Sequence, residues 1–448
     1  MNMMILGLYF IGILIVGGYS YKKIRGSKDF FIAGKDAGVR EITGSLLATV
    51  LGSSAIIGSV NFSYSNGWAG AWFMLCASLG LLLLLPLIDR LEKYKSYNLP
   101  ELMGEFYGRE VKKLSSIIIP IAWIGIVAAQ IMGSAKIVSV FVDMNYGTAV
   151  IISGVVFIAY TFLGGQFSII KTDFIQFIFI IVGVAFAFFF MMNKGGELNG
   201  LGLLNEKFGG LDLFIMILTY SSTFLVGPDI YSRIFCAKDG EIAKKAVKLS
   251  IGILIPLGFL LAAIGVYVSS NYGVDVVKGS VLMFLADKIL PLPLVILLYF
   301  GLLSAVISSA DTTLLTAAST FSQVFIKDLR EENAIKVTRI FILIFGVLSI
   351  LVALKFLFIL PTLLLALAVY SGAFIVPCLA GIFGYRCNKY YALGAIVLGG
   401  SLALYGKLHG GTTGNLIIIS SFVLNFVVLM SGTLTPTPSP SPSKGEGN

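Results

Sequence analysis

The sequence has few of the side chains that carry most enzyme and metal chemistry. It contains one histidine, and the spacing of its four cysteines, Cys76, Cys236, Cys378 and Cys387, matches no metal site. A histidine-based catalytic site and a metal site with several histidine ligands are therefore excluded by count. No GxxxxGK[ST] phosphate-binding motif occurs. We interpret the cysteines as reduced packing residues and expect neither enzyme activity nor an organic cofactor.

Charged residues are also scarce. They make up 12% of the chain, whereas 57% of the residues are hydrophobic and the mean hydropathy is +0.94. Soluble domains carry about a quarter charged residues. Continuous apolar runs such as 177–192 recur along the chain, whereas barrel strands would alternate over about ten residues. We therefore expect an all-α integral membrane protein that lies in a lipid bilayer.

The hydropathy pattern predicts about thirteen membrane-spanning helices. They lie near 3–20, 43–65, 68–88, 114–141, 148–164, 174–193, 214–235, 247–268, 292–322, 338–355, 357–384, 391–406 and 413–431. Most of the 32 basic residues, Arg233 among them, fall in loops on one side if the N-terminus lies outside. Basic loops stay cytoplasmic, so we predict an outer N-terminus and a cytoplasmic C-terminus. The net charge of +9 then reflects topology, and we expect no nucleic-acid partner.

Two predicted spans are poor continuous helices. Span 43–65 contains Gly52, Ser53 and Ser54, and span 214–235 contains a polar stretch at 219–223 followed by Gly227 and Pro228. These are the second and seventh spans, and matched helix breaks point to a transporter binding site. The alternative is that glycine and serine only allow close helix packing. The matched pair favours the binding site.

The breaks divide the chain into two repeats of five spans. We predict an extra helix and inner loop at 1–28, a first repeat at 29–194, an outer loop at 195–213 and a second repeat at 214–385. Two further helices follow at 386–431, and a Pro/Ser-rich segment that we expect to be disordered at 432–448. Because each repeat has an odd number of spans, the second is inverted relative to the first.

Several segments resemble the sodium:solute symporter family, whose members carry sugars, proline, pantothenate, sialic acid and other solutes. They are 29–38 (DFFIAGKDAG), 48–67, 97–108, 164–176, 227–243 and 304–329 (SAVISSADTTLLTAASTFSQVFIKDL). The resemblance implies an inverted five-plus-five bundle of the LeuT type, with one extra helix before it and two after. It also implies a bacterial inner-membrane protein that imports a small organic solute with sodium by alternating access.

The resemblance further implies a sodium site between the first and eighth core helices. Its ligands here are the carbonyl oxygens of Ala48, Leu51 and Ala305 and the hydroxyls of Ser308 and Ser309. Carbonyls freed by a helix break suit this cation, and Na⁺ is the only metal that we expect. The alternative is that both hydroxyls only bond back to carbonyls four residues earlier.

Acidic residues at membrane depth are costly and usually functional. Some family members bind a second sodium at the position of Asp173, and its partners here are Asp311, Thr312 and Ser308. Two carboxylates in one site repel each other unless a cation or a shared proton lies between them. The alternative is that Asp173 caps its helix while Asp311 pairs with a basic residue of an inner loop.

The solute is expected at mid-membrane beside the two breaks. The predicted lining comprises Gly52, Ser53, Ser54, Ala55, Gln130, Tyr220, Ser221, Ser222 and Thr223. Lys136 would favour an organic carboxylate if it faced this site, and otherwise it extends toward the outer surface. A proton-coupled carrier of the same fold and a transporter-like membrane sensor are the alternatives, and no obligate protein partner is implied.

Overall fold

The computed structural model describes residues 2–94, 96, 98–273, 276–277, 279–326, 328–331, 333–356 and 359–432, and only the backbone of residues 2, 5, 53, 54 and 360. The predicted disordered segment at 432–448 therefore lies, except for Gly432, outside the described residues. The described part is helical, with two isolated β-bridges, Ala37 to Ala237 and Asn205 to Phe208. This confirms the all-α class.

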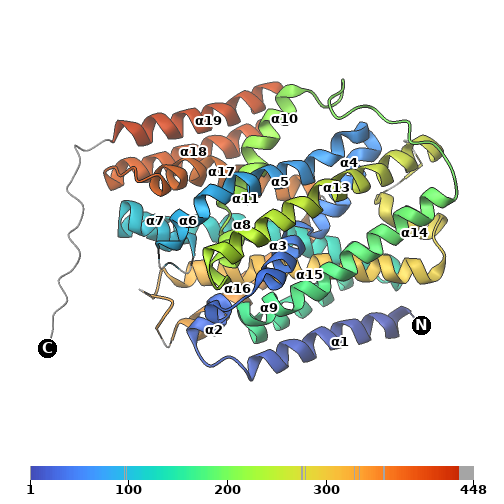
Figure 1. Cartoon of the computed structure of the whole chain (residues 1–448), viewed down its shortest axis with the longest axis horizontal. Coiled ribbons are helices and arrows are strands. Elements are labelled where there is room, and N and C mark those ends of the chain that lie inside the picture. Colours follow the sequence, from blue (N-terminus) through green and yellow to red (C-terminus); the bar gives the residue numbers. More distant parts are fainter. Residues whose placement is uncertain are drawn as a thin grey trace.

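The elements follow one another along the whole described chain (Figure 1). The α-helices are α1 Asn2–Tyr21, α2 Ser27–Ile32, α3 Val39–Val50, α4 Ser53–Asn66, α5 Trp72–Leu84, α6 Ile88–Glu92, α7 Leu99–Tyr107, α8 Arg109–Phe141, α9 Tyr146–Asn193, α10 Gly210–Met216, α11 Ser222–Val226, α12 Pro228–Cys236, α13 Gly240–Tyr272, α14 Val281–Lys288, α15 Leu292–Ser322, α16 Ala334–Lys355, α17 Ile359–Ile382, α18 Lys389–His409 and α19 Gly411–Ser431. Short 3₁₀ turns cover Ala33–Lys35, Gly67–Ala71 and Leu85–Leu87, and a π-helical turn covers Ile217–Ser221.

Ten helical segments of the described residues are long and apolar enough to cross a membrane. The segment Ala55–Glu92 covers the second half of the predicted span 43–65 and all of the next, and α9 covers another predicted pair. The first predicted span lies on a shorter apolar helix, Leu6–Tyr21. The multi-helix membrane architecture is therefore confirmed, and the count of thirteen crossings stays a prediction.

Helix α9 folds back on itself at Gly165. Its 48 residues would extend about 72 Å if straight, far more than the roughly 30 Å of a bilayer core. Gly165 has φ +52°, a left-handed conformation that glycine adopts without a Cβ clash. Tyr160 and Thr172 flank the bend, and their hydroxyls are 2.6 Å apart. The two halves therefore lie side by side near the bend.

Both predicted helix breaks are confirmed. The first separates α3 from α4 at Leu51 and Gly52. The second begins with the π-helical turn Ile217–Ser221 and ends at Gly227, whose extended backbone (φ −67°, ψ 133°) separates α11 from α12. Pro228 follows as the first residue of α12, where its missing amide hydrogen costs nothing.

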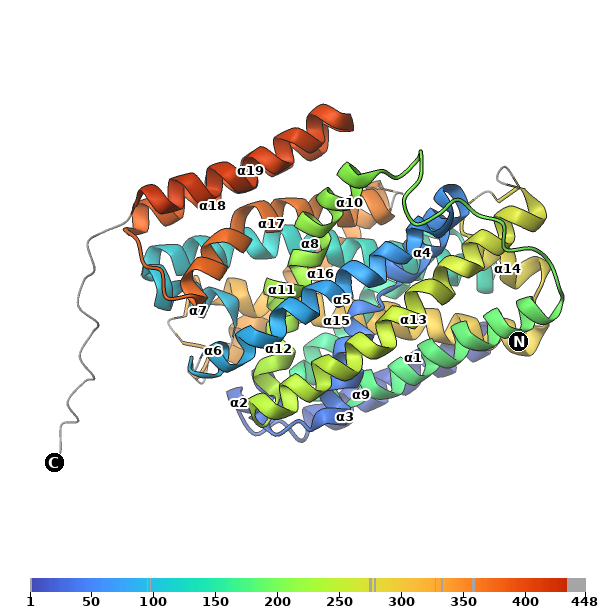
Figure 2. The same ribbon diagram turned by 45° about the horizontal axis from the view of Figure 1, so that its top comes forward.

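Helix α15 lies in the middle of the bundle, where it packs against α3, α8, α9 and α16 (Figures 1 and 2). Helix α1 covers α9 at one edge, and α18 and α19 lie beside α17 at another. Almost every α15 residue from Leu298 to Thr320 is buried, including its serines and Asp311. Its polar groups therefore meet protein rather than lipid.

The bundle has two distinct ends. Helix α1 begins at the end that carries α14, and α19 ends at the opposite end, near α7 (Figure 1). The C-terminal end of α1 is also close to the start of α16, because the Arg339 guanidinium lies 4.7 Å from the centre of the Tyr21 ring. We call these the α14 end and the α7 end.

Gly80 of α5 lets this helix approach the second break closely. A Cβ at this position would overlap the Ser221 carbonyl oxygen and lie 2.9 Å from the Phe224 Cβ. We expect Gly80→Ala to lower the unfolding free energy by about 1–3 kcal/mol, because overpacking displaces backbone. Thermal unfolding in detergent measures this. The control is Gly252→Ala on α13, where a Cβ meets no atom within 4 Å; equal melting temperatures for both variants would contradict the prediction.

Candidate functional site

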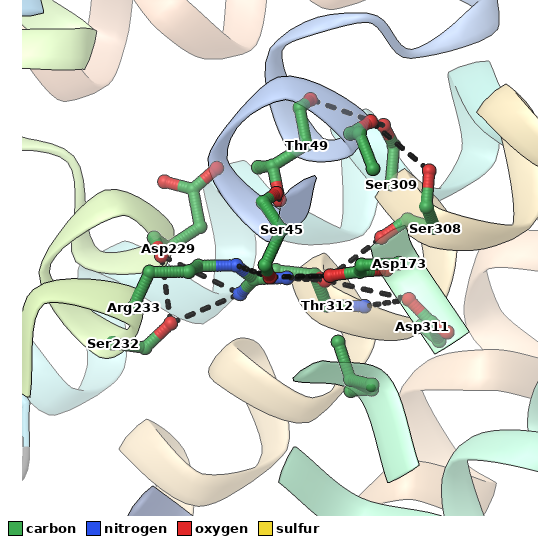
Figure 3. A network of polar contacts seen from close by, with 12 residues as sticks. Ser45, Thr49, Asp173, Asp229, Ser232, Arg233, Ser308, Ser309, Asp311 and Thr312 are labelled. Atoms are coloured by element: carbon green, nitrogen blue, oxygen red, sulfur yellow. Dashed lines mark hydrogen bonds and ion pairs between the residues drawn. The ribbon is translucent and has the colours of Figure 1, made fainter. Parts of the chain in front are cut away.

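Helix α15 places two hydroxyls against the broken end of α3 (Figure 3). Ser308 Oγ lies 3.0 Å from the carbonyl oxygen of Ala48 and 3.2 Å from that of Ala305. Ser309 Oγ lies 3.1 Å from the carbonyl oxygen of Thr49 and 3.4 Å from that of Ala48. Because α3 ends directly after these carbonyls, they have no intrahelical partners. The structure thus brings together four of the five predicted sodium ligands.

Leu51, the fifth predicted ligand, is the first residue after α3 (φ −84°, ψ 36°). The next residue, Gly52, makes the close approach to α15. A Cβ there would lie 2.6 Å from Ser309 Oγ and 3.1 Å from Gln130 Nε2, so a larger side chain would separate the break from these groups.

The oxygen spacing also suits a small cation. Neighbouring oxygens of an octahedral site are √2 times the metal–oxygen distance apart, so 3.0–3.4 Å corresponds to metal–oxygen distances of about 2.1–2.4 Å. This range is close to the roughly 2.3–2.6 Å of Ca²⁺ sites, a cation similar in size to Na⁺. The alternative in which both serines only bond back along α15 is wrong, because both reach α3.

One helical turn farther along α15, a second polar cluster surrounds Asp173 (Figure 3). Asp173 Oδ2 accepts a hydrogen bond from Ser45 Oγ and lies 3.4 Å from Arg233 Nη2. The Arg233 guanidinium also donates to Ser45 Oγ at 3.1 Å and to the Thr312 hydroxyl. Asp311 Oδ1 accepts from the Thr312 amide at 2.6 Å. All five side chains are buried.

Two expectations about this cluster are wrong. Arg233 is not an inner-loop residue, because its side chain is 0% exposed and lies within the bundle on α12. Asp173 does not cap a helix, because it lies eight residues after the bend at Gly165, inside the second half of α9. Sequence reasoning missed Arg233, although its position inside predicted span 214–235 was a signal. A charge at that depth needs a buried partner.

The carboxylates of this cluster are incompletely balanced. Asp173 Oδ1 and Asp311 Oδ2 have no hydrogen-bond partner among the described residues. Two carboxylates and one guanidinium leave one net negative charge when all are ionised, and an unpaired buried charge is unfavourable. A second cation, or a proton on one carboxylate, would remove it.

A small cavity of about 50 Å³ lies beside both helix breaks. Five of the predicted substrate residues line it: Gly52, Ala55, Gln130, Tyr220 and Thr223. The lining that sequence reasoning missed includes Trp123, Phe224 and Asp229. Asp229 directly follows the Gly227–Pro228 break, and an acid at that position was a signal that sequence reasoning passed over.

Four of the predicted substrate residues are not placed on this wall. Ser221 and Ser222 do not line the cavity, and the Ser222 hydroxyl donates to the Leu218 carbonyl in its own helix. The side chains of Ser53 and Ser54 lie outside the described residues, although their backbone begins α4.

Lys136 lines a different cavity, of about 810 Å³, together with Asn61, Ser139, Asp287 and residues around α14. Its ammonium group is therefore not part of the cavity beside the helix breaks. An organic carboxylate is expected only if Lys136 faces the solute. The position of Lys136 on another cavity does not support that expectation.

Comparisons with known proteins identify the family to which the chain is similar. The model of the sodium:solute symporter family matches residues 30–208 and 202–399. The osmoregulated proline transporter OpuE of Bacillus subtilis is 24% identical over an alignment of 458 positions, which covers 94% of this chain and 92% of that protein. Sodium/proline symporter 2 of Staphylococcus saprophyticus is 23% identical, over 77% of this chain and 72% of that protein.

Solved structures show the same fold. A Na⁺-coupled sialic acid symporter, described in a substrate-bound outward-open state, superimposes with a TM-score of 0.80 at 19% identity, over 96% of each chain. A nucleobase-cation-symport-1 family transporter in a closed conformation superimposes with a TM-score of 0.62 at 13% identity, over 90% of this chain and 94% of that one.

Buried polar groups at two broken helices in the centre of an apolar bundle are typical of secondary membrane transporters. The family match covers most of the chain. The chain therefore belongs to the sodium:solute symporter family.

Proposed function

We propose that this protein couples the entry of Na⁺ to the import of a small organic solute by alternating access. The observation that carries this proposal is the contact between two hydroxyls of α15 and the backbone carbonyls at the end of α3. In it, Na⁺ binds the carbonyl oxygens of Ala48, Leu51 and Ala305 and the hydroxyls of Ser308 and Ser309. The ion would then hold α3 and α15 together, next to the solute cavity at Gly52, so that the two ligands stabilise one conformation.

Entry of one Na⁺ down its electrochemical gradient with each solute molecule would supply enough energy for accumulation. Each Na⁺ that crosses a membrane potential of about 100 mV provides about 2.3 kcal/mol, and a tenfold concentration gradient adds about 1.4 kcal/mol. One ion therefore supports accumulation of a neutral solute by several hundredfold.

The proposed topology has thirteen crossings, with inverted repeats at 29–194 and 214–385 separated by a loop at 195–213. The break between α3 and α4 and the break from α10 to α12 support it, because they occupy equivalent positions in the two repeats. Helix α1 of the extra segment 1–28 and helices α18 and α19 of the extra segment 386–431 lie at the edges of the bundle. Basic residues at the α7 end support a cytoplasmic location of that end in a bacterial inner membrane.

A second cation site at Asp173, Asp311 and Thr312 is also part of the proposal. The unpartnered oxygens of both carboxylates support it. A proton-coupled carrier is the alternative that these same carboxylates support, because a proton on Asp311 would balance the charge equally well.

The proposed solute site is the cavity lined by Gly52, Ala55, Gln130, Tyr220 and Thr223. Relatives named as proline transporters and a sialic acid symporter support a small organic solute as the transported species.

Uptake into proteoliposomes tests the proposal. With an inward Na⁺ gradient at constant pH, we expect accumulation of at least one solute from a panel of amino acids, carboxylates and sugars. Replacing Na⁺ by K⁺ on both sides is expected to lower the rate at least tenfold. A rate that is the same in Na⁺ and K⁺ but follows a pH gradient would favour the proton-coupled carrier.

A further inference from the structure

The solute cavity has an acidic residue on its wall. Among the described residues that line it, Asp229 is the only acidic one and none is basic. A carboxylate on the wall of a small cavity deep in an apolar bundle is unfavourable unless a positive group faces it. The protein or its solute must therefore supply that group.

Arg233, one turn farther along α12, acts on this carboxyl group at a distance but forms no direct ion pair with it. Its Nη2 pairs with Asp173, and its Nη1 donates to the Ser232 hydroxyl at 3.0 Å and to the backbone carbonyl of Asp229 at 3.4 Å. The Asp229 carboxyl group points away from the guanidinium (Figure 3). Asp229 Oδ1 has no hydrogen-bond partner among the described residues. The backbone amides of Asp229 and Ile230, in the first turn of α12, lie beside the carboxyl group.

Aromatic side chains make up much of the remaining wall. Trp123, Tyr220 and Phe224 line the cavity, and the Tyr220 and Phe224 rings are in contact, 5.1 Å apart at an angle of 66°. Aromatic faces attract ammonium groups, and tryptophan does so most strongly. A carboxylate beside aromatic rings therefore favours an ammonium group over a neutral or anionic one.

We infer that the cavity selects a compact solute that carries a protonated amine, with the Asp229 carboxylate as its acceptor. This inference rests on the proposed function, because it names the class of solute for the same cavity. The start of α4 at Gly52 and Ala55 also lines the cavity, and the partial positive charge of a helix N-terminus favours a carboxylate there. A small zwitterionic amino acid satisfies both features.

Paired solutes test this on the unmodified protein. L-alanine is compared with propionate, and L-proline with cyclopentanecarboxylate, because each pair differs mainly by the amine. We expect the amino acid to half-saturate uptake at a concentration about 10- to 150-fold lower, the range of a charge-assisted hydrogen bond. K⁺ replaces Na⁺ in the controls, since choline is itself an ammonium ion. Equal or better uptake of the amine-free solutes, or of sugars, would overturn the inference.

The variant Asp229→Asn removes the charge and keeps the shape. We expect it to weaken amino acid binding by about 10- to 150-fold and to keep the rise in melting temperature that Na⁺ causes. Asp239→Asn is the matched control, because Asp239 only caps α13, and asparagine caps equally well. Unchanged binding in Asp229→Asn would refute the inference even if uptake needs Na⁺. Uptake by the unmodified protein that does not depend on Na⁺ would instead refute the proposed function. If Asp229→Asn does not fold, the paired solutes decide alone.

Discussion

The double substitution of Ser308 and Ser309 by alanine is expected to raise the Na⁺ concentration for half-maximal uptake by at least about 100-fold. Both hydroxyls reach the carbonyls at the end of α3, and each ligand oxygen to a charged species contributes about 1.5–3 kcal/mol. The measurements are uptake against Na⁺ concentration and the melting temperature with and without Na⁺. A protein that binds Na⁺ only when folded melts at a higher temperature in its presence, and the double variant should lose this rise.

Ser304→Ala is the matched control for this experiment. Ser304 is also a buried serine of α15, but its hydroxyl bonds the hydroxyl of Tyr9 on α1 at 2.8 Å and does not contact α3. We expect the control to keep the Na⁺ response even if it melts at a lower temperature. A double variant whose melting temperature still rises with Na⁺ as in the unmodified protein would show that the ion binds elsewhere.

The substitution Arg233→Gln is expected to lower the unfolding free energy by about 3–5 kcal/mol. It removes the positive partner of Asp173 while both side chains are 0% exposed, and an uncompensated buried charge is strongly destabilising. Asp173→Asn in the same chain should recover much of the loss, because the carboxylate that paired with Arg233 is then replaced by a neutral amide. Thermal unfolding in detergent and the yield of folded protein measure both effects.

The surface pair Arg330–Asp328 provides the comparison. Arg330 Nη1 and Asp328 Oδ2 are 2.9 Å apart, but the side chains of Arg330 and Asp328 are 44% and 42% exposed. Arg330→Gln is therefore expected to cost no more than about 1 kcal/mol. If Arg233→Gln costs no more than Arg330→Gln, the Arg233–Asp173 pair is not a structural requirement of the bundle. If Asp173→Asn does not restore stability to Arg233→Gln, the loss comes from the other Arg233 contacts, such as those with Ser45 and Thr312.

Much of the fold was predictable because membrane helices must satisfy their own backbone and face lipid with apolar side chains. The same rule made the two breaks visible, since Gly52 and the Gly227–Pro228 pair interrupt otherwise apolar runs. The helix bend at Gly165 lies between the predicted spans 148–164 and 174–193, and α9 contains both because the backbone is helical on either side of the bend. The site was partly predictable: Ser308 and Ser309 meet Ala48 as the family resemblance implied.

The residues that sequence reasoning misplaced share one property: their role depends on contacts between distant segments. Arg233 looked like one more basic residue at a cytoplasmic helix end, yet its guanidinium lies between α3, α9 and α15. Ser221 and Ser222 lie in the second break with Tyr220 and Thr223, but helix rotation turns them away from the cavity. Asp229 became informative only when its carboxyl group was found on the cavity wall, pointing away from Arg233.

The sequence by itself determined an apolar bundle with two interrupted helices and membership of a transporter family, because hydropathy and helix-breaking residues act locally along the chain. Only the tertiary structure decided which polar groups lie close together, which carboxylate pairs with Arg233 and which one, that of Asp229, lines the cavity. The physical reason is that a buried charge is balanced by whatever lies within a few ångströms of it in space. The partners of Arg233 are 60, 79 and 188 residues away along the chain, and no local pattern specifies that distance.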